Sequence, residues 1–205
     1  MAALDRKNFY RYNRHVKFKR RWVLWFAILL LAAIVANYWR QRHLESSQDQ
    51  PILAAARRYG VHPALIKAVV WRESRFDPAA RGTKGEIGLM QIMEPTGREW
   101  ADTEHVTLLF HQQLSDPELN TRCGTWLLRK LLRRYEQTDN ATVYALADYN
   151  AGRTHVLRWA KGAAATNSAE FLQQMTYPGT REYVKSVTKK FAHYAETFPR
   201  LETKP

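Results

Sequence analysis

The sequence contains very little cysteine. Cys123 is the one thiol among 205 residues, so no disulfide can form within the chain. It lies in a segment of helical apolar spacing, near Thr125 and Trp126, and we interpret it as a small core residue rather than a nucleophile. The fold must therefore rest on a hydrophobic core, and the cysteine content does not indicate a cellular compartment.

The spacings typical of metal sites and of nucleophilic enzymes are also missing. No two histidines follow a pattern such as His-x-x-x-His, and the chain has neither a glycine-rich phosphate loop nor a serine elbow. We therefore expect no metal and no cofactor. The histidines of the main domain are interpreted as surface or core residues: His62, His105, His111, His155 and His193.

Acidic residues are scarce near the N-terminus. Residues 1–42 hold ten Lys/Arg against Asp5 alone, which leaves 22 Lys/Arg against 18 Asp/Glu for residues 43–205. The net charge of +13 therefore belongs mostly to the N-terminal segment. An excess of four positive charges spread over a whole domain does not make a nucleic-acid interface, so we expect no nucleic-acid partner.

One long hydrophobic run follows the basic segment. Residues 22–36 are uninterruptedly apolar, and residues 37–39 bring the run close to the length that spans a bilayer. Aromatic side chains mark its two ends, as they do in membrane helices: Trp22, Trp25, Tyr38 and Trp39. We predict a basic cytoplasmic segment at 1–21, a transmembrane anchor at 22–39 and a polar linker at 40–50.

The basic residues before the run predict its orientation. Lys/Arg residues crowd the stretch from Arg6 to Arg21, which favours a cytoplasmic N-terminus, a single-pass anchor in the inner membrane and a periplasmic domain. A cleavable signal peptide is the alternative. The length of the basic segment favours an uncleaved anchor, as does Ile34, which interrupts the small-residue pattern before Ala36.

The rest of the chain, a domain at 51–198 and a tail at 199–205, suits one mainly α fold. Residues 77–88 carry the prolines and glycines of a loop, and a small β element beside the loops stays open. Helices are predicted at 52–59, from Pro63 through residue 76, at 117–135, at 142–147, at 153–159 and at 181–197.

Glu73 stands out because it falls on the apolar face of its helix. A carboxyl group against hydrocarbon loses hydration in its charged form, so its pKa should rise toward neutrality, where it can give and take protons. The alternative is an ion pair with Arg72, Arg75 or Arg98. The other residues of the apolar face are Ile66, Val69, Val70 and Phe76.

Glu73 also begins the first of several motifs that resemble a known family. Glu-Ser-Arg-Phe-Asp-Pro-Ala-Ala at 73–80 and Gly-Leu-Met-Gln at 88–91 resemble the paired motifs of the soluble lytic transglycosylases, close kin of the goose-type lysozymes. Ala-Asp-Tyr-Asn-Ala-Gly at 147–152 resembles a third motif, and residues 116–126 and 181–187 resemble the neighbouring helices. The resemblance runs over residues 52–194.

This resemblance implies a lysozyme-like domain that cleaves peptidoglycan glycan strands between N-acetylmuramic acid and N-acetylglucosamine without adding water. Glu73 would protonate the glycosidic oxygen and then, as a base, activate the muramic 6-hydroxyl to close a 1,6-anhydro ring. The substrate's own acetamido group would stabilise the anomeric carbon. A single acid of raised pKa fits such a substrate-assisted reaction, whereas most glycosidases use two carboxylates.

The resemblance also implies which residues contact the sugar. Met90 and Gln91 would line the sugar subsites, and Met93 would pack against the glycan. Plain core packing is the alternative for the two methionines.

Four further residues are implied to lie around the acid. Ser74 would orient Glu73 through a hydroxyl hydrogen bond, and Tyr183 matches a tyrosine near the acid. Tyr149 and Asn150 would hold the glutamate and the substrate's N-acetyl group. The alternatives are core packing for the two tyrosines and a turn or cap role for Asn150.

Two positions depart from the family pattern. Gly82 stands where serine is frequent and Gly179 where glutamate is frequent, and neither change removes the acid. A muramidase-type hydrolase stays open, with Asp148 or Glu86 as its second carboxylate. So does a catalytically weak peptidoglycan-binding scaffold.

Overall fold

The computed structural model describes residues 6–107 and 110–198, with side chains from residue 22 onward. It divides into two units after His43. The first holds most of α1 (Arg6–Ser47), whose apolar side chains from Trp22 to Trp39 are largely exposed. By length and composition, the helical stretch that begins at Trp22 is the one in the described chain that could cross a membrane.

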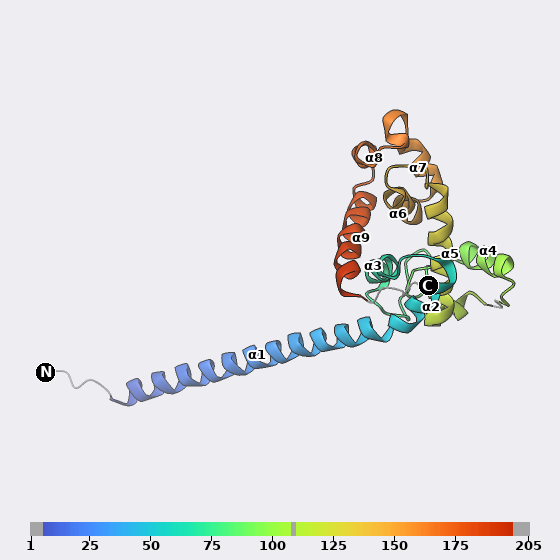
Figure 1. Ribbon diagram of the computed structural model, residues 1–205. Coiled ribbons are helices and arrows are strands. Elements are labelled where there is room, and N and C mark those ends of the chain that lie inside the picture. Colours follow the sequence, from blue (N-terminus) through green and yellow to red (C-terminus); the bar gives the residue numbers. More distant parts are fainter. Residues whose placement is uncertain (1–5, 108–109, 199–205) are drawn as a thin grey trace. The chain divides into compact units, whose positions relative to one another are not determined.

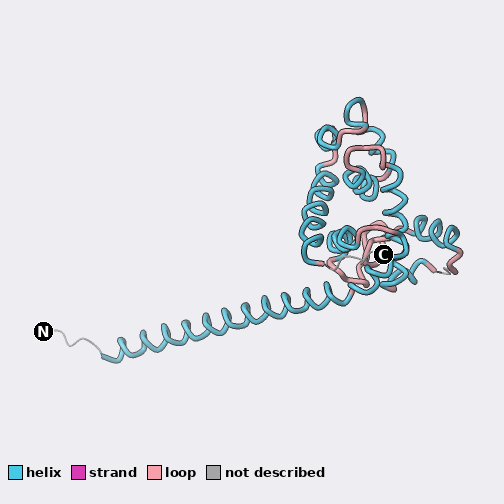
Figure 2. Tube along the Cα trace, in the orientation of Figure 1, coloured by secondary structure: helices cyan, strands magenta, loops and turns pink. Residues whose placement is uncertain are grey.

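The second unit, from Leu44 onward, is a helical domain (Figure 1). Figure 2 shows no strand in the described chain; in place of the small β element there are two isolated antiparallel bridges, from Ile87 to Arg81 and to Ile92. The mainly α prediction is therefore confirmed. The elements are α2 (Asp49–Tyr59), α3 (Pro63–Ser74), α4 (Glu94–Glu104), η1 (His111–Ser115), α5 (Pro117–Arg134), α6 (Ala141–Ala151), α7 (Arg153–Trp159), η2 (Gly162–Ala165), α8 (Ser168–Gln174) and α9 (Pro178–Thr197).

The stretch predicted as a polar linker at 40–50 is helical. Helix α1 continues to Ser47, and α2 begins two residues later at Asp49. Leu44 packs against the domain core and Gln48 is buried, so the domain begins before residue 51. Polar composition indicated exposure here, but residues such as glutamate and glutamine are also good helix formers, and polarity alone does not predict a break.

Local sequence signals explain several helix ends. Gly60 ends α2 in the left-handed conformation (φ 64°), and its N–H donates to the Ala56 carbonyl at 2.9 Å. Pro63 occupies the first turn of α3, where the missing N–H costs nothing. The Asp116 side chain caps α5 by accepting from the Leu119 N–H at 2.9 Å. Helix α6 is longer than predicted and runs through residues 148–151.

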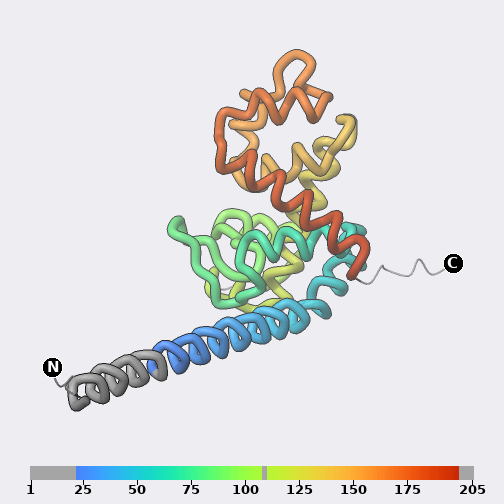
Figure 3. Tube along the Cα trace, turned by 90° about the vertical axis from the view of Figure 1, so that its left-hand side faces the viewer, coloured from blue at the N-terminus to red at the C-terminus, as the bar shows by residue number. Residues whose placement is uncertain are grey.

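Two helices are buried nearly all round and form the centre of the domain. Residues 63–70 of α3 and 143–148 of α6 are buried. Helix α9 packs against both of them, while α5 packs against α2 and α6. Figure 3 shows α9 running past α3, with the 75–95 loop on the other side of α3. Side chains from three parts of the chain therefore meet where α3 ends.

Lys67 is buried inside this arrangement, with 5% of its surface exposed. Its ammonium forms an ion pair with Asp49 at 2.7 Å and lies 4.1 Å from the ring centroid of Phe198. A buried cation needs such partners because its hydration is lost. The ion pair joins α2 to α3, and the aromatic contact joins α3 to the end of α9.

A buried amide holds the loop that precedes α4. The Asn120 side chain, on α5, accepts from the Met90 N–H at 2.7 Å and donates to the carbonyls of Ile87 at 2.8 Å and Leu114 at 2.7 Å. Gly88 lies directly on this amide, where a Cβ would overlap it, and has a φ of 78°. Backbone groups that cannot reach water are thus satisfied by one side chain.

We predict that Asn120→Ala lowers the free energy of unfolding by about 2–4 kcal/mol, because one buried N–H and two buried carbonyls lose their partner. Denaturant unfolding measures the effect. Asn140→Ala is the matched control, since Asn140 is exposed and its side chain makes no cap hydrogen bond. Equal stability of the two variants would contradict the role assigned to Asn120.

Candidate active site

Glu73 lies in the last turn of α3, where α9 crosses it. The Tyr183 hydroxyl, from α9, donates to Oε1 of Glu73 at 2.6 Å. Tyr183 is buried, and Glu73 is half-buried at the domain surface. The structure therefore places Tyr183 beside the acid, as the resemblance implied, and the carboxyl can reach both a fixed hydroxyl and a ligand from solvent.

Burial raises the pKa of Glu73 to about 7. The hydrogen bond from Tyr183 and the positive charge of Arg72 oppose this rise, because both favour the ionised carboxylate, whereas the negative charge of Glu86 adds to it. Burial, with the neighbouring Glu73 charge, also raises the pKa of Tyr183 well above its usual range. The raised pKa expected from the apolar face of the helix is present.

The three arginines considered as ion-pair partners of Glu73 are engaged elsewhere. The Arg98 guanidinium pairs with Glu94 at 2.5 Å. Arg75 lies over the Trp71 ring at 3.9 Å, and Arg72 lies over the Tyr183 ring at 5.4 Å. Within residues 22–107 and 110–198, Glu73 forms no ion pair, so the alternative of an ion pair with one of these arginines is wrong.

Ser74 does not orient the acid. Its hydroxyl lies near the carbonyls of Leu89, at 2.9 Å, and Val70, at 3.2 Å. A hydroxyl has one proton, which these backbone carbonyls share, so the expected bond from Ser74 to Glu73 is wrong. Ser74 instead ties the end of α3 to the loop that carries Gly-Leu-Met-Gln.

Tyr149 and Met90 are joined through the backbone. The Tyr149 hydroxyl, in α6, donates to the Met90 carbonyl at 2.7 Å. Burial, together with the charge of Glu73, raises the pKa of Tyr149 well above its usual range. Met90 has 0% exposure, and its side chain packs on Gly124 of α5. Core packing, rather than sugar contact, is therefore the role that the structure gives to the Met90 side chain.

The remaining predicted contacts lie nearer to solvent. Gln91 adopts a left-handed conformation (φ 48°), and its amide donates to the Gly88 carbonyl at 2.8 Å. Met93 is 38% exposed at the start of α4, and Asn150 is exposed in the last turn of α6. Gln91, Met93 and Asn150 can therefore reach a ligand, and their contacts with sugar stay predictions.

Gly82 makes room for a carboxylate. A Cβ at this position would overlap the carboxylate of Glu86 and press on the amide oxygen of Gln91. The Glu86 carboxylate also accepts from the Lys84 N–H at 2.9 Å. The Glu86 side chain thus occupies the space that a side chain at position 82 would need. A side chain at Gly179 would meet open space.

Asp148 is committed to the scaffold. Its Oδ2 atom accepts from Arg134 at 2.7 Å and from the Tyr135 hydroxyl at 2.7 Å, and the residue is buried. Of the two carboxylates considered as a partner for Glu73, Glu86 is the one whose charge reaches it. Cys123 is buried, and burial raises the pKa of its thiol far above the usual range, as for a core residue.

Comparison with known proteins identifies the family. The model of the transglycosylase SLT domain matches residues 50–172. The soluble lytic murein transglycosylase of Salmonella typhimurium is 27% identical over 197 residues, which cover 90% of this chain and 27% of that protein. The membrane-bound lytic murein transglycosylase F of Desulfosudis oleivorans is 35% identical over 105 residues, covering 50% of this chain and 21% of that protein.

A solved structure supports the same assignment. It shows an inactive glutamate-to-glutamine mutant of the lytic transglycosylase Slt from Pseudomonas aeruginosa, with a TM-score of 0.66 and 28% identity over 72% of this chain and 24% of that one. The chain belongs to the transglycosylase SLT domain family, within the lysozyme-like superfamily. It spans about a quarter of the length of the curated relatives it matches.

The sequence did not predict the residues that hold the loop beside Glu73 in place without contacting Glu73 themselves. Asn120 lies within residues 116–126, which resemble a helix of the family, but its three hydrogen bonds could not be predicted from residue spacing. Glu86 was considered as the second carboxylate of a hydrolase. Its packing over Gly82 depends on how the 77–88 loop folds, which residue spacing does not predict. A polar residue of helix α5 on its buried face was the one available signal for Asn120.

We predict that Glu73→Gln stabilises the protein at alkaline pH relative to the wild type. The unfolded carboxyl ionises near its ordinary value of 4.5 and the folded one near 7, so the wild type loses stability as pH rises between these values. Glutamine has no proton to lose. Thermal unfolding at about pH 4 and about pH 8 should show the gain in Tm growing with pH.

Glu136→Gln serves as the control for this measurement, because Glu136 is exposed. Its effect on Tm should not depend on pH in the same direction. A Glu73→Gln variant whose Tm difference from the wild type is constant with pH would contradict a raised pKa at Glu73.

Proposed function

We propose that this chain is a membrane-anchored lytic transglycosylase that cleaves the bond between N-acetylmuramic acid and N-acetylglucosamine in peptidoglycan, with Glu73 as the single acid and base. The observation that carries the proposal is the Glu73 carboxyl, raised to a pKa of about 7 by burial and held by Tyr183. Near neutral pH such a group can both give and accept a proton. Family membership supports the substrate class.

The reaction follows from one carboxyl acting twice. Protonated Glu73 donates to the glycosidic oxygen as that bond breaks, and the substrate's acetamido oxygen stabilises the anomeric carbon. The carboxylate then takes the proton of the muramic 6-hydroxyl, whose oxygen closes the 1,6-anhydro ring. Glu73 ends as it began, protonated, and no water is consumed. Tyr183 keeps Oε1 in place through both proton transfers.

The proposed location is the inner membrane, with the domain in the periplasm. The apolar helix from Trp22 and the membrane-bound relative from Desulfosudis oleivorans support an anchor. The orientation rests on the Lys/Arg residues between Arg6 and Arg21, which favour a cytoplasmic N-terminus.

A hydrolase of the same bond is the second candidate, and Glu86 is the observation that favours it. Its carboxylate lies close enough for its charge to raise the pKa of Glu73, so it could activate water on the opposite face of the sugar. Asp148 is a poorer base, because Arg134 and Tyr135 already donate hydrogen bonds to its carboxylate.

We predict that digestion of purified peptidoglycan by the full chain yields 1,6-anhydromuramoyl ends, and that Glu73→Gln lowers kcat by at least about a hundredfold. Mass spectrometry distinguishes the products, since a hydrolysed end is heavier by one water. Glu86→Gln should keep the anhydro product. Reducing ends from the wild type that disappear in Glu86→Gln would establish the hydrolase, and unchanged turnover by Glu73→Gln would make Glu73 dispensable.

The dependence of kcat on pH gives a second prediction, with opposite signs for two variants. Activity should fall as pH rises through about 7, because Glu73 must start protonated. Tyr183→Phe removes a hydrogen bond that favours the carboxylate, so the alkaline limb should move up by about one pH unit. Glu86→Gln removes a negative charge, so the limb should move down by less. Shifts in the same direction would contradict this account.

A further inference from the structure

A concave site lies between α3 and α9, the two helices that carry Glu73 and Tyr183. It is a groove of about 520 Å³, within the size range of ligand sites. Trp71 forms its wall on α3, and α9 contributes Lys185, Lys189 and Lys190. The groove shares both of its helices with the Glu73–Tyr183 pair, yet neither of those two residues lines it.

The groove carries an excess of positive charge. Glu182 is the one carboxylate among its described lining residues, against three lysines. Within the part of the chain whose side chains are described, the ion pairs of the domain involve other residues, so these lysines have no carboxylate partner. Cations gathered in a concave site raise the local concentration of anions.

The wall of the groove is aromatic and already attracts cations. The Arg75 guanidinium lies 3.9 Å from the Trp71 ring centroid, and the Lys190 ammonium lies 5.3 Å from it. An indole with cations on it offers apolar surface to an aliphatic group and positive charge to a carboxylate next to it. A flat membrane surface would not need such a wall, whereas a short peptide with carboxylates and small aliphatic side chains would use both features.

We propose that this groove binds the acidic stem peptide of the peptidoglycan strand whose sugar lies at Glu73. The inference rests on the proposed function for the presence of that strand. Trp71 precedes Glu73 by two residues on α3, so their side chains leave the helix on different faces, and the stem would pass around the last turn of α3 to reach the groove. An extended peptide of four residues reaches about 13 Å, which exceeds the roughly 10–12 Å diameter of a helix with its side chains, so a stem attached to the sugar is long enough for this path.

Arg72 marks the path from the acid to the groove. On α3 it lies between Trp71 and Glu73, and its guanidinium sits over the Tyr183 ring at 5.4 Å. A peptide leaving the sugar would pass this cation before it meets the lysines. Binding at the groove would therefore position the strand without touching the reacting atoms, and Lys185 and Lys189 are specificity-determining rather than catalytic residues.

The test measures binding without turnover. Calorimetric titration of the full chain in detergent uses a synthetic stem tetrapeptide with free carboxylates, and the same peptide with its carboxylates amidated. We predict that the acidic peptide binds the wild type, that the amidated peptide binds more weakly, and that Lys185→Gln/Lys189→Gln raises the Kd of the acidic peptide by about tenfold. Added salt should weaken binding of the acidic form.

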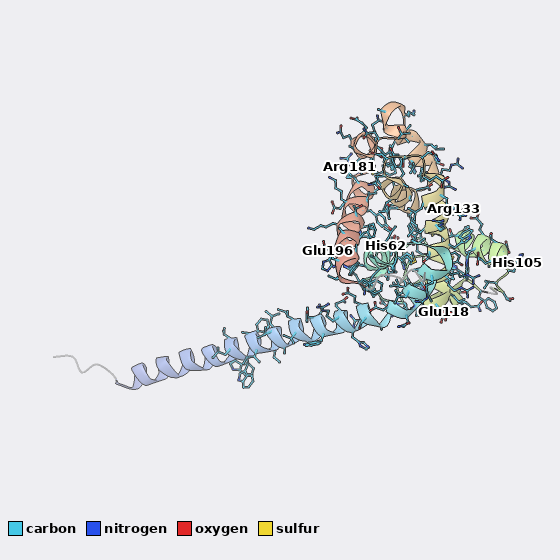
Figure 4. The ribbon with its side chains drawn as sticks, viewed as in Figure 1. His62, His105, Glu118, Arg133, Arg181 and Glu196 are labelled. Atoms are coloured by element: carbon cyan, nitrogen blue, oxygen red, sulfur yellow. The ribbon has the colours of Figure 1, made fainter. Side chains whose placement is uncertain are left out.

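A charge-matched control separates a local effect from a loss of net charge. Arg133→Gln/Lys161→Gln removes two exposed cations elsewhere; Arg133 lies on α5 (Figure 4). This variant should keep the wild-type Kd. Equal affinity for the two peptides, or equal Kd for wild type and lysine variant, would overturn the proposal. So would a lysine variant that loses binding to phosphatidylglycerol vesicles while the wild type binds no peptide.

Turnover separates this proposal from the proposed function. On glycan strands that carry stem peptides, the lysine variant should show a raised KM and an unchanged kcat; on strands stripped of peptides, both constants should match the wild type. If the wild type cleaves neither strand, the proposed function fails, and peptide binding in the calorimeter still decides the groove. Cleavage of stripped and peptide-bearing strands with the same KM by the wild type would overturn the groove assignment.

Discussion

The hydrogen bond from Tyr183 to Glu73 is the interaction on which the site depends, because it crosses the contact between α3 and α9. Burial favours the neutral acid and the tyrosine favours the carboxylate, so the pKa settles near neutrality rather than far above it. Both residues lie on helices whose other faces are fixed in the core. The chemistry of one carboxyl thus depends on the packing of two helices.

The motif residues around Glu73 act mostly on the backbone. Ser74 bonds to the Leu89 carbonyl, Tyr149 to the Met90 carbonyl, and Asn120 to three backbone groups. These bonds come from α3, α6 and α5, and all but the bond from Asn120 to the Leu114 carbonyl of η1 reach the loop that precedes α4. The loop is therefore held by these hydrogen bonds as well as by its own buried apolar side chains, among them Ile87, Leu89 and Ile92. Rigid placement of a loop by surrounding helices is how a small domain can present a substrate surface with precision.

Sequence patterns predicted what local physics controls. Helical periodicity placed Glu73 on the apolar face, and Gly60 and Pro63 marked a helix end and a helix start. Sequence patterns did not predict features that depend on contacts between residues far apart in the sequence. The polar stretch after residue 40 is helical, because its residues have good helix propensity and extend α1 to Ser47, and Leu44 packs against the hydrophobic core. The buried Lys67 ammonium is stabilised by an ion pair with Asp49 and a cation–π contact with Phe198, and neither partner is near it in sequence.

The departures from the family pattern, Gly82 and Gly179, have different physical meanings. A Cβ at Gly179 would meet nothing within 4 Å, so no neighbouring side chain takes the place of the glutamate that is frequent in the family. At Gly82 the side chain of Glu86 fills the volume that a serine would need, and it brings a negative charge toward Glu73. That charge works with burial to keep the acid protonated. Arg134 and Tyr135 already donate hydrogen bonds to Asp148, so under the proposed function Glu73 would donate the proton and the charge of Glu86 would tune its pKa. Such an arrangement would suit a reaction in which the substrate supplies its own nucleophile.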